Sequence, residues 1–188
     1  LVAADSQDIR PLIVLNKCDL TDRLPAAKES LATYRSLGYP IIELSARNGP
    51  DTLRQHLKGE TSVLVGQSGM GKSTLLNALV PGANAATREI SEALDTGKHT
   101  TTHARLYHLD AETHLIDSPG LQEFGLHHLD LHTLEAAFPE FGPHLGRCRF
   151  RDCHHDREPD CALRGALARG EIDPRRFECY QMLRTEVA

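Results

Sequence analysis

The segment from Gly66 to Ser73 has the residue types and spacing of a loop that surrounds phosphate groups. Its sequence fits the pattern G-x-x-x-x-G-K-[ST], and it reads Gly66-Gln67-Ser68-Gly69-Met70-Gly71-Lys72-Ser73. The glycines would let backbone N–H groups curve around phosphate without obstruction by a Cβ atom. Lys72 would reach the β- and γ-phosphates, and the Ser73 hydroxyl would bind Mg²⁺. We add the next residue, Thr74, to the predicted nucleotide-binding residues.

The context of this loop favours phosphate binding over a glycine-rich turn that fits the pattern by chance. A short apolar run at 62–65 predicts a buried strand before the loop, and residues 72–80 predict a helix after it. The helix N-terminus adds a dipole that favours anions.

A second phosphate motif, Asp117-Ser118-Pro119-Gly120, follows another predicted strand. Asp117 would hold Mg²⁺ through water, and the Gly120 N–H would contact a γ-phosphate. Alone, this sequence is equally typical of a tight turn. Its position after the phosphate loop, with a long loop and a hairpin between, makes the pair a strong indication of a nucleoside triphosphate site.

The sequence Asn16-Lys17-Cys18-Asp19 predicts recognition of guanine. Guanine presents two adjacent donors, so a carboxylate such as Asp19 can accept from both, while Lys17 packs its stem on the base. Asn16 would tie the base loop to the phosphate loop. A helix cap is the alternative for this short pattern. Ser45-Ala46 is a weaker signal, in which a backbone N–H would meet guanine O6.

Three cysteines, Cys148, Cys153 and Cys161, lie within fourteen positions, together with His154 and His155. Three thiolates and one imidazole form the closed ligand set that zinc prefers. We therefore predict a structural zinc site in a reducing compartment, with a chance cluster as the alternative. Either histidine fits the residue types.

The order of the predicted elements is that of an α/β fold. Apolar runs and helix-end signals predict strands at 11–15, 41–44, 62–65, 106–109 and 114–116, and helices at 25–37, 51–57, 72–80, 162–168 and 174–187.

The composition is that of an ordinary globular protein. The 188 residues are 40% hydrophobic and 25% charged, with a formal net charge of −5. This charge argues against a uniformly basic nucleic-acid-binding protein. No apolar run is long enough to span a bilayer and no signal peptide is recognised, so we expect no membrane partner. Nothing in the sequence indicates an obligate dimer, and we expect a monomer.

Together, these motifs resemble those of one family. N-K-C-D and S-A precede the phosphate loop and D-S-P-G, whereas most GTPases have the phosphate loop first. With the Cys/His cluster after them, the chain resembles ribosome small-subunit-dependent GTPase A of bacteria. The resemblance implies a circularly permuted P-loop GTPase domain at 1–140 and a small, mostly helical zinc-binding domain at 141–188. That family carries an oligonucleotide-binding barrel before the GTPase domain. We recognise none here, and expect one strand of the GTPase sheet to be missing as well.

The resemblance also assigns residue roles. Leu121 occupies the position where many GTPases carry a water-orienting Gln, so His99, in the loop at 81–102, is the implied catalytic residue, together with Lys72. A solvent-exposed loop histidine is the alternative. Thr101 is the preferred candidate for binding Mg²⁺, and Thr102 is the second candidate. The spacing of the family's zinc ligands selects His155 over His154.

The implied function is that of a cytoplasmic factor that binds and hydrolyses GTP during late maturation of the small (30S) ribosomal subunit, which stimulates the hydrolysis. The implied ligands are GTP or GDP, Mg²⁺ and one structural Zn²⁺, and the partner is the subunit with its 16S rRNA. One alternative is a zinc-stapled RNA-binding module with little turnover. Another is a P-loop ATPase or kinase, against which Asp19 argues. The arginines around the zinc ligands would contact rRNA phosphate or pair with neighbouring acidic residues: Arg147, Arg149, Arg151, Arg157 and Arg164.

Overall fold

The computed structural model describes residues 1–85, 104–118 and 129–187. The chain forms two compact units. The first, here called the helical unit, comprises Leu1–Pro11, Ala32–Tyr39 and Gly125–Ala188. The second, the sheet unit, comprises Leu12–Leu31 and Pro40–Phe124.

The strands of the sheet unit belong to two small sheets. In one, β1 (Ile13–Leu15) runs parallel to β2 (Ile41–Glu43), with Ile13 opposite Ile41. In the other, the order is β3-β5-β4, where β3 is Thr61–Leu64, β4 is Arg105–His108 and β5 is His114–Asp117. β5 pairs parallel with β3 and antiparallel with β4. The predicted α/β fold is confirmed, because parallel strands alternate with helices.

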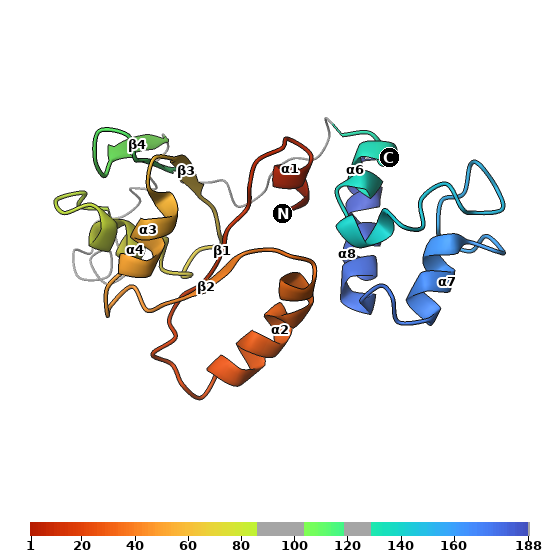
Figure 1. The fold of residues 1–188 in the computed structure, drawn as a ribbon, viewed down its shortest axis with the longest axis horizontal. Helices are drawn as coiled ribbons and strands as arrows, with labels where there is room; N and C mark the ends of the chain where they lie inside the picture. The colour runs from red at the N-terminus through yellow and green to blue at the C-terminus, as the bar shows by residue number, and fades with distance from the viewer. Residues whose placement is uncertain (86–103, 119–128, 188) are drawn as a thin grey trace, which may run out of the picture. The chain divides into compact units, whose positions relative to one another are not determined.

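Three helices connect these strands in chain order (Figure 1): α2 (Leu24–Ser36), α3 (Asp51–Leu57) and α4 (Lys72–Leu79). The last turns of α2, from Ala32 onward, belong to the helical unit. Apolar side chains of α3 and α4 pack with those of β2 and β5 in one core. Its buried members are Ile42, Leu44, Ala46, Leu53, Leu57, Leu75, Leu76, Leu79, Ala85 and Leu115. This core fixes the helix that follows the phosphate loop.

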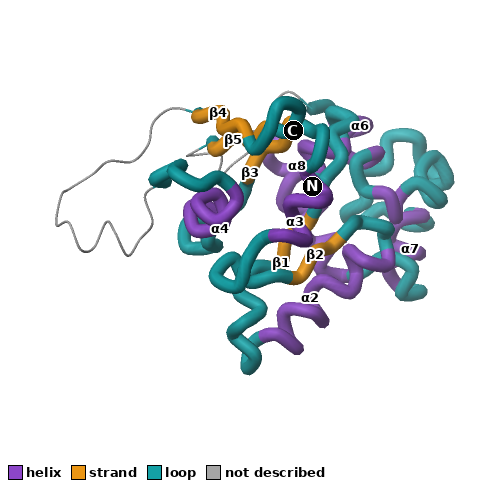
Figure 2. Tube along the Cα trace, turned by 60° about the vertical axis from the view of Figure 1, so that its left-hand side comes forward, coloured by secondary structure: helices purple, strands orange, loops and turns teal. Residues whose placement is uncertain are grey.

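The helical unit contains four helices and one 3-10 turn within its described residues. They are α1 (Val2–Asp5), α6 (Leu131–Ala136), the turn η1 (Pro139–Phe141), α7 (Ala162–Ala168) and α8 (Pro174–Val187), besides the end of α2. The chain between η1 and α7 is loop throughout, drawn in teal in Figure 2. Phe138, Phe141 and Tyr180 are fully buried and pack ring against ring. This aromatic core connects η1 to α8.

The predicted helices at 51–57, 162–168 and 174–187 have the observed bounds, and the ends of the other predicted elements differ by at most two residues. β1 begins at Ile13 rather than at Pro11, because proline has no N–H to donate, and the Ile13 N–H bonds to the Pro40 carbonyl at 3.0 Å. Among the described residues, no helix combines the length and the apolar character needed to cross a membrane.

Candidate functional site

The phosphate loop lies between the end of β3 and the start of α4. Gly69 and Gly71 both have positive φ angles, 79° and 94°, which side chains rarely tolerate. The Lys72 ammonium donates to the carbonyl oxygens of Gly66 and, at 3.1 Å, of Gln67. Ser73 and Thr74 lie in the first turn of α4. The loop therefore curves back over its own lysine, as a phosphate-binding loop does.

Asn16 joins the loop after β1 to the phosphate loop. Its Nδ2 donates to the Met70 carbonyl at 3.1 Å, and its Oδ1 accepts from the Lys17 and Ala46 N–H groups at 2.8 and 3.0 Å. Lys17 makes a second connection, because its ammonium donates to the Gly69 carbonyl at 2.6 Å. Three segments distant in sequence thus meet at one side chain.

Asp19 is held by Ser45. The Ser45 hydroxyl donates to Asp19 Oδ1 at 2.6 Å, and this hydrogen bond is the main cause that lowers the pKa of the Asp19 carboxyl. Asp19 is therefore ionised at neutral pH and presents two acceptor oxygens. From the sequence, Ser45 and Ala46 were predicted only to meet the base. In the structure Ser45 also orients Asp19, and Ala46 donates to Asn16, which no local pattern indicated.

Asp117 is the last residue of β5. It pairs in register with Leu64, the last residue of β3, so its backbone lies beside the strand end from which the phosphate loop departs. Both strands run in the same direction, and their carboxyl ends therefore meet at one edge of the sheet. The other predicted site residues, His99, Thr101 and Gly120, lie outside the described residues.

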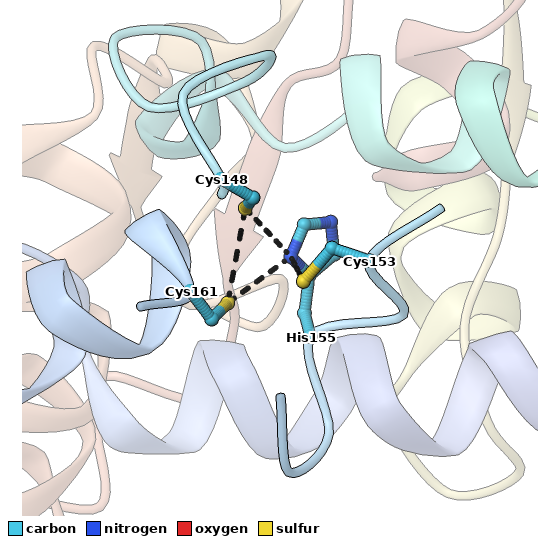
Figure 3. Close-up of side chains that lie close together, drawn as sticks. All are labelled: Cys148, Cys153, His155 and Cys161. Atoms are coloured by element: carbon cyan, nitrogen blue, oxygen red, sulfur yellow. Dashed lines mark hydrogen bonds between the residues drawn. The ribbon is translucent and has the colours of Figure 1, made fainter. Parts of the chain in front are cut away.

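The helical unit brings three cysteines and one histidine together. Figure 3 shows Cys148, Cys153, His155 and Cys161 converging on one point, and their ligand atoms all lie within 4.8 Å of one another. His155 Nδ1 is 3.5, 3.5 and 3.2 Å from the sulfurs of Cys148, Cys153 and Cys161. The Cys148 and Cys161 sulfurs are 3.9 Å apart. All five cysteines of the chain are free of disulfide bonds.

These distances fit a tetrahedral zinc ion. Bonds of about 2.3 Å to sulfur and about 2.0 Å to nitrogen imply S···S and S···N separations of roughly 3.8 and 3.5 Å. His155 is buried, whereas His154 is exposed, so the structure brings His155 and not His154 to the cluster. The four side chains therefore fit one closed metal site with no position left for substrate.

The loop that carries His155 is organised by Glu158. Its carboxylate accepts from the backbone N–H groups of His154, Asp156 and Arg157 at 2.8, 2.9 and 3.1 Å. These bonds lower the pKa of Glu158 to about 2. His155 itself has a φ of 59°, a conformation rare for residues with a side chain. Sequence patterns gave no signal for Glu158.

The Glu135 carboxylate and the Cys161 sulfur both contact His155. Burial favours the neutral imidazole, but hydrogen bonds to the Glu135 carboxylate and the Cys161 sulfur outweigh burial and raise the pKa of His155 to about 9. Burial likewise opposes ionisation of Glu135, and its hydrogen bonds with His155 and Tyr180 outweigh that effect and lower its pKa. The cluster thus lies in an environment suited to a cation.

The order of these motifs and the fold define the class of circularly permuted GTPases. A sequence profile of the RsgA GTPase family matches residues 1–127, and the chain belongs to this family.

Individual proteins are similar over nearly the whole chain. The small ribosomal subunit biogenesis GTPase RsgA of Ralstonia pickettii (strain 12J) is 58% identical over 191 aligned residues, which cover 97% of this chain and 61% of the relative. The crystal structure of YjeQ from Thermotoga maritima matches with a TM-score of 0.76 at 34% identity, covering 99% of this chain and 63% of that one. The structure of YloQ, described as a circularly permuted GTPase, matches with a TM-score of 0.73 at 30% identity, covering 99% and 60%. The chain therefore spans about three fifths of the length of these relatives.

Proposed function

We propose that this protein binds GTP with Mg²⁺ and hydrolyses it to GDP and phosphate. The observation that carries the proposal is the convergence on Asn16, whose side chain contacts both the phosphate loop at Met70 and the base loop at Ala46. A site that unites a phosphate-binding loop with an ionised, oriented Asp19 suits guanine nucleotides. An adenine nucleotide would leave the Asp19 carboxylate facing no pair of donors.

Different residues bind the phosphates, bind Mg²⁺ and orient the attacking water. Lys72 and the backbone of residues 66–71 hold the β- and γ-phosphates, and the N-terminus of α4 favours their charge. Ser73, Asp117 and Thr101 would hold Mg²⁺, which would supply positive charge against the phosphates. Gly120 would contact the γ-phosphate, and His99 would orient the attacking water.

We further propose that Cys148, Cys153, His155 and Cys161 hold one structural Zn²⁺. The fit of the observed separations to a tetrahedral site supports this assignment. The loop between η1 and α7 contains few large apolar residues, and a metal replaces the core that such a segment cannot build.

The partner that the family relationship supports is the small ribosomal subunit with its 16S rRNA. The Ralstonia relative is named for small ribosomal subunit biogenesis. The protein would then act as a monomer in the cytoplasm, with hydrolysis timed by the subunit. The arginines near the zinc ligands supply positive charge for rRNA phosphate, although Arg149 pairs with Asp160 at 3.0 Å.

The test is GTP turnover with and without purified small subunits, using Lys72→Ala as the inactive control. Large stimulation that Lys72→Ala abolishes supports the proposal. Tight GTP binding without turnover in either condition would instead favour an RNA-binding module in which the nucleotide only switches affinity. Competition by ATP as effective as by GTP would contradict the assignment of Asp19.

A further inference from the structure

The Glu135 carboxylate on α6 contacts the outer face of the predicted zinc ligand His155. Its Oε1 lies 3.2 Å from His155 Nε2 and accepts a hydrogen bond from the Tyr180 hydroxyl at 3.0 Å. The three side chains are well shielded: His155 is 7% exposed, Glu135 is 19% exposed and Tyr180 is fully buried. A partly buried carboxylate therefore bridges α8 and the metal cluster.

The two nitrogens of His155 face different partners. Nδ1 lies 3.2 to 3.5 Å from the three sulfurs, whereas Nε2 faces Glu135. An ionised carboxylate is an acceptor only, so it favours a proton on Nε2, and in the neutral imidazole the lone pair is then on Nδ1, the nitrogen that faces the sulfurs. An acceptor behind the distal nitrogen also fixes the ring orientation and makes the ligand more basic.

Tyr180 fixes Glu135 in turn. Its ring belongs to the aromatic core with Phe138 and Phe141, so the hydroxyl is held in place and restrains the carboxylate. Another carboxylate of this unit, that of Glu140, instead pairs with Arg176 at 2.7 Å. Within the described part of the chain, the Glu135 carboxylate is paired with the predicted zinc ligand His155 and with Tyr180.

We propose that Glu135 is a positioning residue for the zinc centre, which holds His155 in the ligating tautomer and orientation, and that Tyr180 holds Glu135. This inference rests on the proposed zinc site. It assigns α6 a role in metal binding, although α6 contributes no ligand.

The experiment measures zinc affinity of the zinc-loaded full chain by competition with a chromogenic chelator at neutral pH. Glu135→Ala should weaken zinc binding about 10- to 100-fold, since loss of such a partner has that effect in other zinc proteins. Glu135→Gln keeps an acceptor oxygen and should lose less. Tyr180→Phe, which removes only a hydroxyl, should weaken zinc binding by a smaller factor than Glu135→Ala.

The matched control is Asp173→Asn, which removes a carboxylate of the same unit at the start of α8 and outside the metal cluster. It should lower thermal stability without changing zinc affinity. The second readout is the visible spectrum of the Co²⁺-substituted protein, which reports the ligand field. Glu135→Ala should change this spectrum, and Asp173→Asn should leave it unaltered.

The outcomes distinguish a failure of the zinc site from a failure of the positioning role of Glu135. If the wild-type chain binds no zinc, the zinc site itself is wrong, and the role of Glu135 is overturned with it. If the wild-type chain binds zinc and Glu135→Ala changes affinity and spectrum no more than Asp173→Asn does, only the positioning role is overturned. Weaker binding and an altered spectrum in Glu135→Ala, with neither change in Asp173→Asn, establish the role.

Discussion

Gly71 lies directly against the side-chain amide of Asn16. A Cβ atom at Gly71 would fall 2.5 Å from Asn16 Nδ2, the same atom that donates to the Met70 carbonyl. The glycine therefore does more than leave room for phosphate. It allows the base loop to approach the phosphate loop closely enough for Asn16 to connect them.

This contact predicts that Gly71→Ala weakens GTP binding about 10- to 100-fold, because a displaced Asn16 leaves polar groups unpaired at a cost of roughly 1–3 kcal/mol. Titration with a fluorescent guanine nucleotide measures the loss. Gly59→Ala is the matched control, since Gly59 also has a positive φ, 74°, but no atom within 4 Å of the added Cβ. Gly59→Ala should lower stability by about 1 kcal/mol and leave affinity unchanged. Equal affinities of the two variants would contradict the prediction.

Asp19, which the Ser45 hydroxyl orients, is the predicted base-recognising residue, so replacing it should change the base preference of the site. Asp19→Asn keeps the shape but exchanges one acceptor oxygen for a donor amine. GTP affinity should fall on the order of 100-fold or more, because two charge-assisted hydrogen bonds are lost. Xanthine carries a carbonyl where guanine carries its amine, so binding of XTP should improve. Ser45→Ala should weaken GTP binding less and gain no XTP binding. Asp22→Asn, an exposed aspartate near Asp19 in sequence, serves as the control. Unaltered preference in Asp19→Asn would exclude Asp19 from the base site.

The sequence predicted the elements of this fold well where the local signal was complete. The apolar run at 62–65 and the glycines before Lys72 were enough to predict a strand, a loop and a helix. The close spacing of the three cysteines likewise indicated a metal site. These features depend on neighbours in sequence, which a single chain displays directly.

The remaining features depend on residues far apart in sequence. Glu135 is 20 positions from His155, and Tyr180 is 45 from Glu135, so no local pattern connects them. The bond from Asn16 to Met70 spans 54 positions. The residue types alone left His154 and His155 as alternatives; the family resemblance selected His155, and the fold brings that residue to the cysteines. Local spacing indicates which chemistry is present, and tertiary packing decides which side chains orient it.

The buried ion pair between Arg176 and Glu140 predicts a large effect on stability. The two side chains are 5% and 6% exposed, and the guanidinium lies 4.5 Å from the centre of the Phe138 ring. Glu140→Gln leaves a buried charge without its counter-charge and should lower the free energy of unfolding by about 3–5 kcal/mol. Urea unfolding monitored by circular dichroism measures the change.

The exposed ion pair of Glu171 with Arg169 provides the comparison for Glu140. Those side chains are 44% and 56% exposed, so Glu171→Gln should lower the stability far less than Glu140→Gln does. Equal losses in Glu140→Gln and Glu171→Gln would show that burial does not set the strength of these pairs. A double variant, Arg176→Met with Glu140→Leu, should recover part of the loss, because apolar side chains need no counter-charge.

Asp173 predicts a defined pH dependence of stability. The Thr33 hydroxyl donates to Asp173 Oδ2 at 2.5 Å and the Arg175 N–H donates to Oδ1 at 2.8 Å, and these bonds, that from Thr33 first, lower the pKa of Asp173 to about 2. The unfolded chain has the ordinary aspartate pKa of about 3.9. Because the folded value is the lower one, the contribution of Asp173 is complete above about pH 4 and is lost as the pH falls toward 2.

Asp173→Asn tests this window, because the amide has the shape of the carboxylate and does not titrate. The wild type should be more stable than Asp173→Asn by about 1 kcal/mol at pH 7 and at pH 5, a value reduced for the partial exposure of the side chain. The difference should shrink steadily below pH 4. Urea unfolding of both proteins across this range measures it, and loss of zinc in acid affects both alike and cancels in the difference. If the difference in free energy of unfolding between the two proteins stays constant from pH 7 to pH 3, the carboxylate charge contributes nothing at this position.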